Sequence, residues 1–224
     1  MTNKLRPFRH VPRDAREWAR WMEEQDLTPD GVTSYDSLTV GNLTVTDSFE
    51  IQDTYYDDLK FPAASANPPG LASDPDFDTT NGGYLFDAGS TELLFFAAQM
   101  PHAWKEGTGI HPHLHWQKTT SASGNVYWQL DYKMAPIGEV MDSSFTTLTT
   151  TSVVGSTPDT DTANKHLISS FDEISMTGKG LSDMILIKLS RIGGSDTYGA
   201  DARLLEFDIH YEINSFGSAQ EFRQ

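Results

Sequence analysis

Hydrophobic and polar residues alternate with a period of two along two segments in the second half of the chain. In residues 126–134 the apolar positions are Val126, Trp128, Leu130, Tyr132 and Met134. In residues 204–213 one set is Leu205, Phe207, Ile209, Tyr211 and Ile213, and the other is Leu204, Glu206, Asp208, His210 and Glu212. Because successive side chains of a strand point to opposite faces, each segment is expected to be a strand with one core face and one polar face.

The same reasoning, with turn residues as boundaries, predicts eight strands after residue 83. They cover residues 84–86, 93–99, 110–118, 126–134, 146–154, 166–171, 184–191 and 204–213. No helical period separates them, and parallel strands would require crossover helices. We therefore expect an all-β fold, an antiparallel β-sandwich or jelly roll.

The first 26 residues have a different pattern. The stretch "PRDAREWARWMEEQ" (12–25) predicts a short helix, with Ala15, Trp18 and Met22 on one face and Trp21 beside them. Its arginines share another face: Arg13, Arg16 and Arg20. A helix of three to four turns is marginal alone, so we expect its tryptophan face to dock on the rest of the chain or on a different protein.

Residues 27–52 contain the echo "LTVGNLTV" (38–45), in which β-branched residues surround a Gly-Asn step. The echo is compatible with a hairpin and also with the intertwined β-shaft of a fibrous trimer. We therefore divide the chain into three parts: a basic arm and helix (1–26), a β-linker or trimerising shaft (27–52) and a β-sandwich head (53–224).

Charge is distributed unevenly over the 224 residues, whose net charge is −16. Residues 1–20 hold six Lys or Arg against two acidic residues, a net +4. Residues 21–224 hold ten basic and thirty acidic residues, a net −20. An acidic body argues against nucleic-acid binding, which requires a basic surface.

Cysteine is absent, which excludes disulfides and Cys-ligated zinc. We find no signal-peptide pattern at the start and no apolar run of about 18 residues, so neither secretion by a signal peptide nor a membrane span is expected. Motifs of nucleophilic hydrolases, P-loop proteins and zinc proteases are also missing from the sequence. We expect no enzymatic activity.

The segment "IHPHLHWQK" (110–118) places His111, His113 and His115 on one polar strand face. Same-face neighbours on a strand lie about 6.6 Å apart, so the outer two histidines lie about 13 Å apart. Metal–nitrogen bonds of about 2.1 Å cannot bridge that distance. One strand therefore cannot wrap all three histidines around a single metal ion.

Three interpretations of these histidines remain open. His210, with Glu206, Asp208 and Glu212 on its strand, could complete a two-histidine-one-carboxylate metal site. Such a site resembles that of a cupin enzyme, although Gln117 and Lys118 stand where the cupin carboxylate is expected. Alternatively, three chains could direct the histidines at one transition metal on a trimer axis. The third interpretation is a polar face without metal.

The stretches "RPFRHVPRDAREWARWMEEQ", "SLTVGNLTV" and "AQMPHAWKEGTGIHPHLHW" together resemble small structural proteins of tailed-bacteriophage virions. These are neck or collar spikes, head fibres and tail-associated fibres. The resemblance implies a homotrimer, made in the bacterial host cytoplasm and built into the virion. It implies other virion proteins as partners, namely portal, connector or capsid, and no resident cofactor.

On this interpretation the anchoring residues are Arg13, Arg16, Trp18, Arg20 and Trp21. The candidates for a trimer-axis or surface metal site are His111, His113, His115 and His210. The head either decorates the particle or contacts the host surface, where aromatic side chains could stack on sugars. A carbohydrate-binding module is therefore a further alternative.

Overall fold

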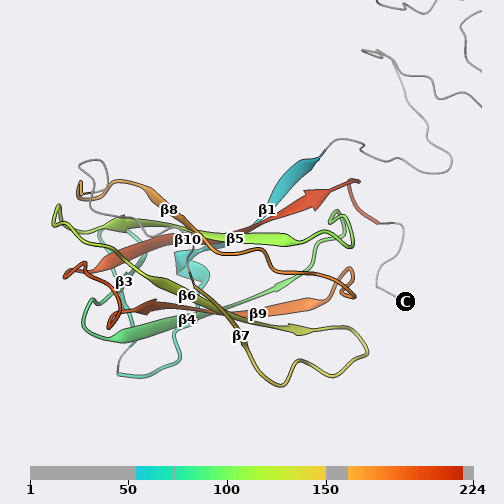
Figure 1. Cartoon of the computed structure of the whole chain (residues 1–224), viewed down its shortest axis with the longest axis horizontal. Coiled ribbons are helices and arrows are strands. Elements are labelled where there is room, and N and C mark those ends of the chain that lie inside the picture. The colour runs from blue at the N-terminus through green and yellow to red at the C-terminus, as the bar shows by residue number, and fades with distance from the viewer. Residues whose placement is uncertain (1–53, 73, 150–160, 219–224) are drawn as a thin grey trace, which may run out of the picture. The chain divides into compact units, whose positions relative to one another are not determined.

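The computed structural model describes residues 54–72, 74–149 and 161–218 (Figure 1). The predicted helix, the β-linker and all five anchoring candidates lie outside these ranges, as do residues 150–154 of the fifth predicted strand. Within the described ranges, no helix combines the length and the hydropathy needed to cross a membrane.

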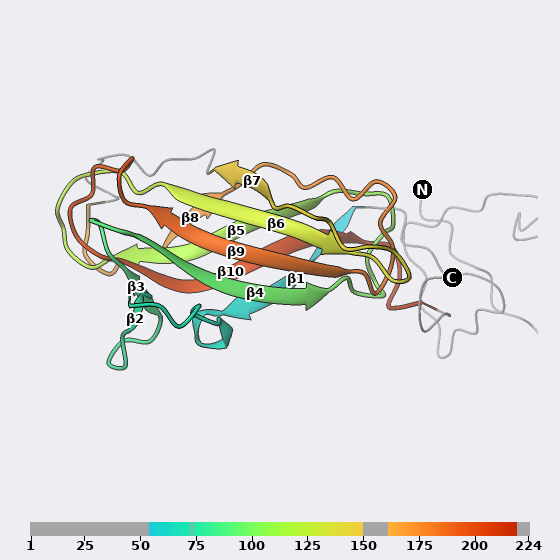
Figure 2. The same ribbon diagram turned by 90° about the horizontal axis from the view of Figure 1, so that it is seen from below.

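Two antiparallel sheets pack face to face, one in each layer of Figure 1. The first sheet has the order β2 (Asp76–Phe77), β3 (Tyr84–Phe86), β10 (Ala202–Ile213), β5 (Ile110–Lys118) and β8 (Leu167–Ser170), and β1 (Tyr55–Pro62) also pairs with β10. The second has the order β4 (Thr91–Gln99), β9 (Met184–Ile192), β6 (Trp128–Ala135) and β7 (Thr146–Thr149) (Figure 2). Among the described residues, the structure has one 3-10 helix, η1 (Ala63–Ser65), which directly follows β1.

The strand order is that of a jelly roll. Along the chain β3 pairs with β10, β4 with β9, β5 with β8 and β6 with β7, as in one long hairpin folded over on itself. These eight strands are the ones that the hydrophobic pattern predicts, and β3 and β5 have the predicted bounds. The predicted fold class, an antiparallel β-sandwich of jelly-roll type, is confirmed.

The core lies between the two sheets and is rich in aromatic side chains. Trp128 of the second sheet packs edge-on against Phe86 and Trp116 of the first, with ring centroids 5.1 and 5.8 Å apart. Phe96 and Phe207 also meet across the layers, with ring centroids 5.6 Å apart and ring planes tilted by 33°. Burying such side chains contributes about 25 cal/mol per Å² of apolar surface, which makes this contact layer the main stabilising element of the head.

The structure corrects the predicted faces at the start of β10. Leu204 is fully buried and Leu205 is partly exposed, the reverse of what strict alternation predicts. The reason is a β-bulge: the register of β10 against β5 shifts between Leu204 and Glu206. At the same place β10 changes its other partner, because residues 202–204 pair with β3 and residues 206–213 pair with β1.

Strands β1 and β2 were not among the predicted strands. β1 has the sequence "YYDDLKFP", and only Phe61 in it is buried. Its other side chains are exposed or half-buried, so no apolar period marks it. β2 has only two residues, which is too short for a pattern.

Candidate functional site

The candidate site lies on the outer face of the first sheet, where β5 and β10 run side by side. The apolar side chains of Ile110, Leu114 and Trp116 are fully buried on the core side of β5, as predicted. The histidines of β5 consequently point away from the core. Cross-strand pairing sets His111 opposite His210, His113 opposite Asp208, and His115 opposite Glu206: the partners lie in three successive rows.

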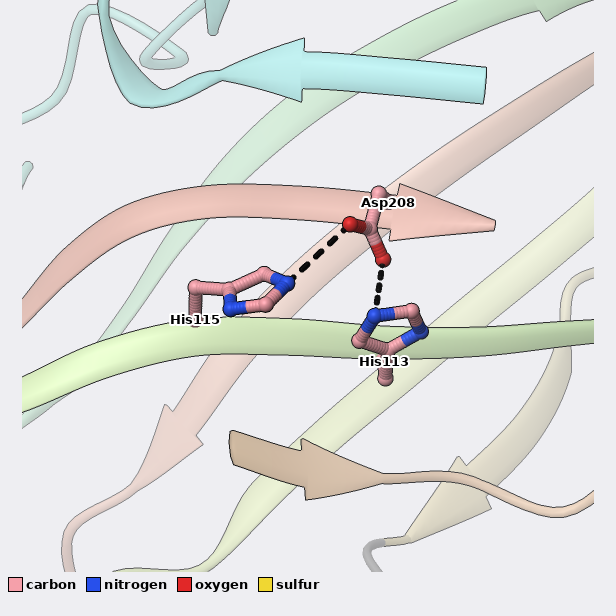
Figure 3. A group of neighbouring side chains, drawn as sticks. All are labelled: His113, His115 and Asp208. Carbon is pink, nitrogen blue, oxygen red and sulfur yellow. Dashed lines mark hydrogen bonds and ion pairs between the residues drawn. The ribbon is translucent and has the colours of Figure 1, made fainter. Parts of the chain in front are cut away.

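His113 and His115 converge on the carboxylate of Asp208 (Figure 3). Nε2 of His113 lies 2.5 Å from Oδ1 of Asp208, and Nε2 of His115 lies 3.1 Å from Oδ2. One nitrogen or oxygen atom from each of the three side chains lies within 4.8 Å of the other two. Two imidazoles from one strand therefore share one carboxylate from the next.

The shared carboxylate is buried although it belongs to an outer sheet face. The side chains of Asp208 and His113 are 5% and 9% exposed, and His115 is 21% exposed. Burial by itself lowers the pKa of His113, because it penalises the charged imidazolium. The contact with Asp208 and the negative charge of that carboxylate outweigh the burial, so the pKa of His113 lies above its usual value.

Oδ1 of Asp208 is a buried oxygen without a hydrogen bond from any described residue. Its contact with His113 meets the distance of an ion pair but lacks the alignment of a hydrogen bond. Buried polar atoms are usually hydrogen-bonded, so an orphan carboxylate oxygen beside two imidazole nitrogens is an uncommon arrangement. This atom has unused capacity to accept a donor or to bind a cation.

A further histidine, His166, supports His115 from the segment just before β8. Nδ1 of His115 lies 2.6 Å from Nε2 of His166, and the two rings are 4.8 Å apart. The sequence interpretation did not single out His166. The only signal for it was its position as the first residue of the predicted strand 166–171, which does not reveal that this strand pairs with β5.

His111 and His210 lie on the same face but contact other carboxylates. Nε2 of His210 is 3.0 Å from Oδ1 of Asp58, and Nε2 of His111 is 3.8 Å from Oε2 of Glu173. The His210 ring also packs edge-on against that of His113, at 4.3 Å. The structure thus brings all four predicted histidines onto one face, but among them only His113 and His115 meet at a common carboxylate.

His113, His115 and Asp208 can either bind a metal ion or pair with one another. Two imidazole nitrogens and one carboxylate oxygen are ligands for a divalent transition metal, with coordination positions left for water or another ligand. Without a metal, the same groups form a compact ion-paired network. In either case the three groups link β5 to β10 on the outer face of the sheet.

Comparison with known proteins found no matching family model and no matching curated protein sequence. Solved structures with some similarity include the isomaltodextranase of Arthrobacter globiformis T6 complexed with panose, at 16% identity over 68% of this chain and 23% of that chain, with a TM-score of 0.38. A CBM35 from Cellvibrio japonicus Abf62 matches at 11% identity over 73% of this chain and all of that chain, with a TM-score of 0.38. The infectious bursal disease virus Gx strain structure matches at 14% identity over 83% of this chain and 42% of that chain, with a TM-score of 0.37.

The chain thus spans less than a quarter of the isomaltodextranase. Because all these TM-scores are low, the assignment of the jelly roll rests on the strand order described above.

Proposed function

We propose that this chain is a structural component of a tailed-phage virion. On this proposal it is a trimeric fibre, spike or decoration protein without enzymatic activity, made in the cytoplasm of the bacterial host. Its N-terminal part, residues 1–26, attaches it to a portal, connector or capsid protein. The jelly-roll head is then the part that the particle displays.

The observation that carries the proposal is the contrast between the two ends of the chain. The described core of the head is built from residues between Phe61 and Tyr211 and forms a complete sandwich of two sheets. Residues 1–20 carry a net charge of +4 and include Trp18, with Trp21 directly after them, whereas residues 21–224 carry a net charge of −20. A display domain with a separate basic attachment segment accounts for this division.

Attachment through residues 1–26 is energetically reasonable. Burying two tryptophans and Met22 in a partner would contribute on the order of several kcal/mol before ordering costs. Arg13, Arg16 and Arg20 would add specificity and association rate by facing acidic groups of that partner. In a trimer the segment would be present three times, which would raise the overall affinity for the partner through multivalent binding.

The test is incorporation into particles. The native chain, the double variant Trp18→Ala/Trp21→Ala and the matched control Glu23→Ala/Glu24→Ala are supplied to a phage that lacks its own copy, and purified particles are assayed for the protein. We expect the tryptophan variant to keep the native melting temperature and trimer mass but to be lost from particles. Native-level incorporation of that variant would refute the anchoring role.

A second candidate function, binding of a host-surface glycan, is favoured by the aromatic side chains at β1. Tyr55 and Tyr56 are each 52% exposed. The Tyr56 ring lies 5.9 Å from that of His111 and 6.3 Å from that of His210, so it borders the histidine face. Exposed aromatic faces next to polar groups are suited to stacking on sugars. A glycan array would test this: binding should disappear in Tyr56→Ala and persist in Phe216→Ala, which removes another exposed aromatic ring.

A further inference from the structure

We infer that His113, His115 and Asp208 form a binding site for one divalent transition metal ion within each chain. The site goes beyond the proposed role in a virion and does not depend on it, since the three ligands come from β5 and β10 of the same head. Zn²⁺, Ni²⁺, Co²⁺ and Cu²⁺ are the ions that two imidazoles and a carboxylate favour.

The distances are close to those of a metal centre. In a tetrahedral site with bonds of about 2.1 Å, two ligand atoms lie about 3.4 Å apart. One ligand atom from each residue already lies within 4.8 Å of the other two. The two imidazole nitrogens lie 2.5 and 3.1 Å from the two different carboxylate oxygens of Asp208. Both imidazole rings direct a nitrogen atom at the Asp208 carboxylate (Figure 3).

The orphan oxygen of Asp208 supplies a second and independent observation. Oδ1 is buried and receives no hydrogen bond from the described residues, while His113 Nε2 stands beside it at 2.5 Å without donating in line. A cation bound to both atoms would satisfy both, because each would offer it a lone pair, and the two atoms would then move apart to the spacing of metal ligands. An oxygen left without a donor in this position is what a metal ligand requires.

His166 fits the role of an outer-shell residue. To bind a metal through Nε2, His115 must carry its proton on Nδ1, and that proton needs an acceptor. Nε2 of His166 lies 2.6 Å from this Nδ1 and can accept it. Metal ligands of this kind usually have such a partner for the second ring nitrogen, and it fixes both tautomer and ring orientation.

The site is accessible from solvent, and the number of ions per chain distinguishes it from a shared site. His115 is 21% exposed, so an ion can reach the group from the outer face while Asp208 and His113 remain shielded. The intrachain site predicts one ion per chain. A shared site on a trimer axis, in which three chains contribute histidines, predicts one ion per three chains. The two are therefore separable by counting ions.

The experiment uses the full chain without a histidine tag, stripped with a chelator and titrated with Zn²⁺ by calorimetry. Co²⁺ absorption reports the ligand set, and native mass spectrometry reports ions per chain. We expect one ion per chain and a rise in melting temperature with Zn²⁺. Replacing an outer-shell residue typically weakens metal binding by about 10–100-fold, and we expect that loss for His166→Gln. His113→Gln and His115→Gln remove a ligand and should weaken Zn²⁺ binding by more than this.

Matched controls lie on the same face. His111→Gln and His210→Gln remove the same chemistry from residues that pair with Glu173 and Asp58, and both should bind Zn²⁺ as the native chain does. Asp208→Asn should also lose Zn²⁺ binding. If this variant fails to fold because Asp208 is buried, His115→Gln tests the site, because the His115 side chain is partly exposed and the melting temperature of the metal-free variant shows whether it folds. Three results would each overturn the inference. The first is that Zn²⁺ does not bind saturably, and the second is that His113→Gln and His115→Gln bind Zn²⁺ as the native chain does. The third is a stoichiometry of one ion per three chains, with binding lost in His111→Gln.

Discussion

Arg191 and Asp196, five residues apart in the chain, form a buried ion pair in which Nε of the arginine lies 2.6 Å from Oδ2 of the aspartate. Their side chains are 0% and 3% exposed. The guanidinium group also donates hydrogen bonds to the backbone oxygens of Phe86, Tyr198 and Ala200 at 2.6 to 2.8 Å. One side chain thus ties the end of β9 to β3 of the opposite sheet and to the loop that leads into β10.

Replacing Arg191 by Met should lower the free energy of unfolding by about 3–5 kcal/mol, because it leaves Asp196 and three carbonyl groups buried without their partner. Burial already raises the pKa of Asp196, and Arg191 opposes that rise. The additional change Asp196→Asn should therefore recover part of the loss. Urea unfolding of both variants measures this, and a loss below about 1 kcal/mol in Arg191→Met would contradict the prediction.

Two neighbouring glycines offer a matched pair for backbone strain. Gly82 and Gly83 both have positive φ, +74° and +92°. A Cβ at Gly82 would meet no heavy atom within 4 Å, whereas one at Gly83 would lie 2.2 Å from the backbone oxygen of Leu204. Gly82→Ala should cost only the left-handed conformation, about 1–2 kcal/mol. Gly83→Ala should lower the free energy of unfolding by about 1–3 kcal/mol more than Gly82→Ala, because β3 must move away from β10. Thermal unfolding of the two variants measures this, and equal melting temperatures would argue against this packing.

Asp131 of β6 should make stability depend on pH in the acid range. Lys188 lies 2.7 Å from Oδ2 of Asp131, and Thr147 and Gln129 donate hydrogen bonds to the same carboxylate. Burial of Asp131 raises its pKa, but these contacts outweigh burial, so the pKa lies below the ordinary 3.8. A carboxylate with a lowered pKa contributes stability above the unfolded-state value, and the contribution is lost as pH falls through the folded-state value.

We therefore expect Asp131→Asn to reduce the free energy of unfolding by about 1–3 kcal/mol at pH 7. The difference between native and variant chains should shrink once the pH falls below about 4. Urea unfolding at pH 7, 5 and 3 is the measurement. A difference that stays constant down to pH 3 would mean that the ionised carboxylate does not contribute.

Tyr211 of β10 should ionise at a higher pH than an ordinary tyrosine. Burial and the hydrogen bond to Asp57 of β1, at 3.1 Å, raise its pKa to about 12. Ultraviolet titration should show a tyrosine that ionises near pH 12, and Asp57→Asn should lower the pKa of Tyr211 because the negative charge is removed. If the titration is unchanged in Asp57→Asn, β1 does not hold Asp57 against Tyr211 in solution.

The local part of the site was predictable and the non-local part was not. Alternation placed the histidines of β5 on one face because a period of two depends only on neighbouring residues. It left Glu206, Asp208 and Glu212 as equal candidates for the carboxylate, since the choice depends on the register of β10 against β5. Register is set by pairing between residues about a hundred positions apart, to which periodicity is blind.

Two deviations from the predicted pattern have the same origin in strand pairing. The exchange of Leu204 and Leu205 follows from the bulge at which β10 changes partners. β1 carries almost no apolar period because most of it is exposed, and it becomes a strand by pairing with β10. Neither feature has a local signal, because each depends on the neighbouring strand.

The pairing of β1 with β10 also determines how the head would respond to mechanical load. Any tension in the chain before Tyr55 enters the head through β1, which is antiparallel to β10 from Tyr55 opposite Ile213 to Pro62 opposite Glu206. A pull opposed at the β3 end of the sandwich would shear all of these pairs at once. A pull opposed at the C-terminal end of β10 would open them one after another. The force that the head withstands would therefore depend on the direction from which it is pulled.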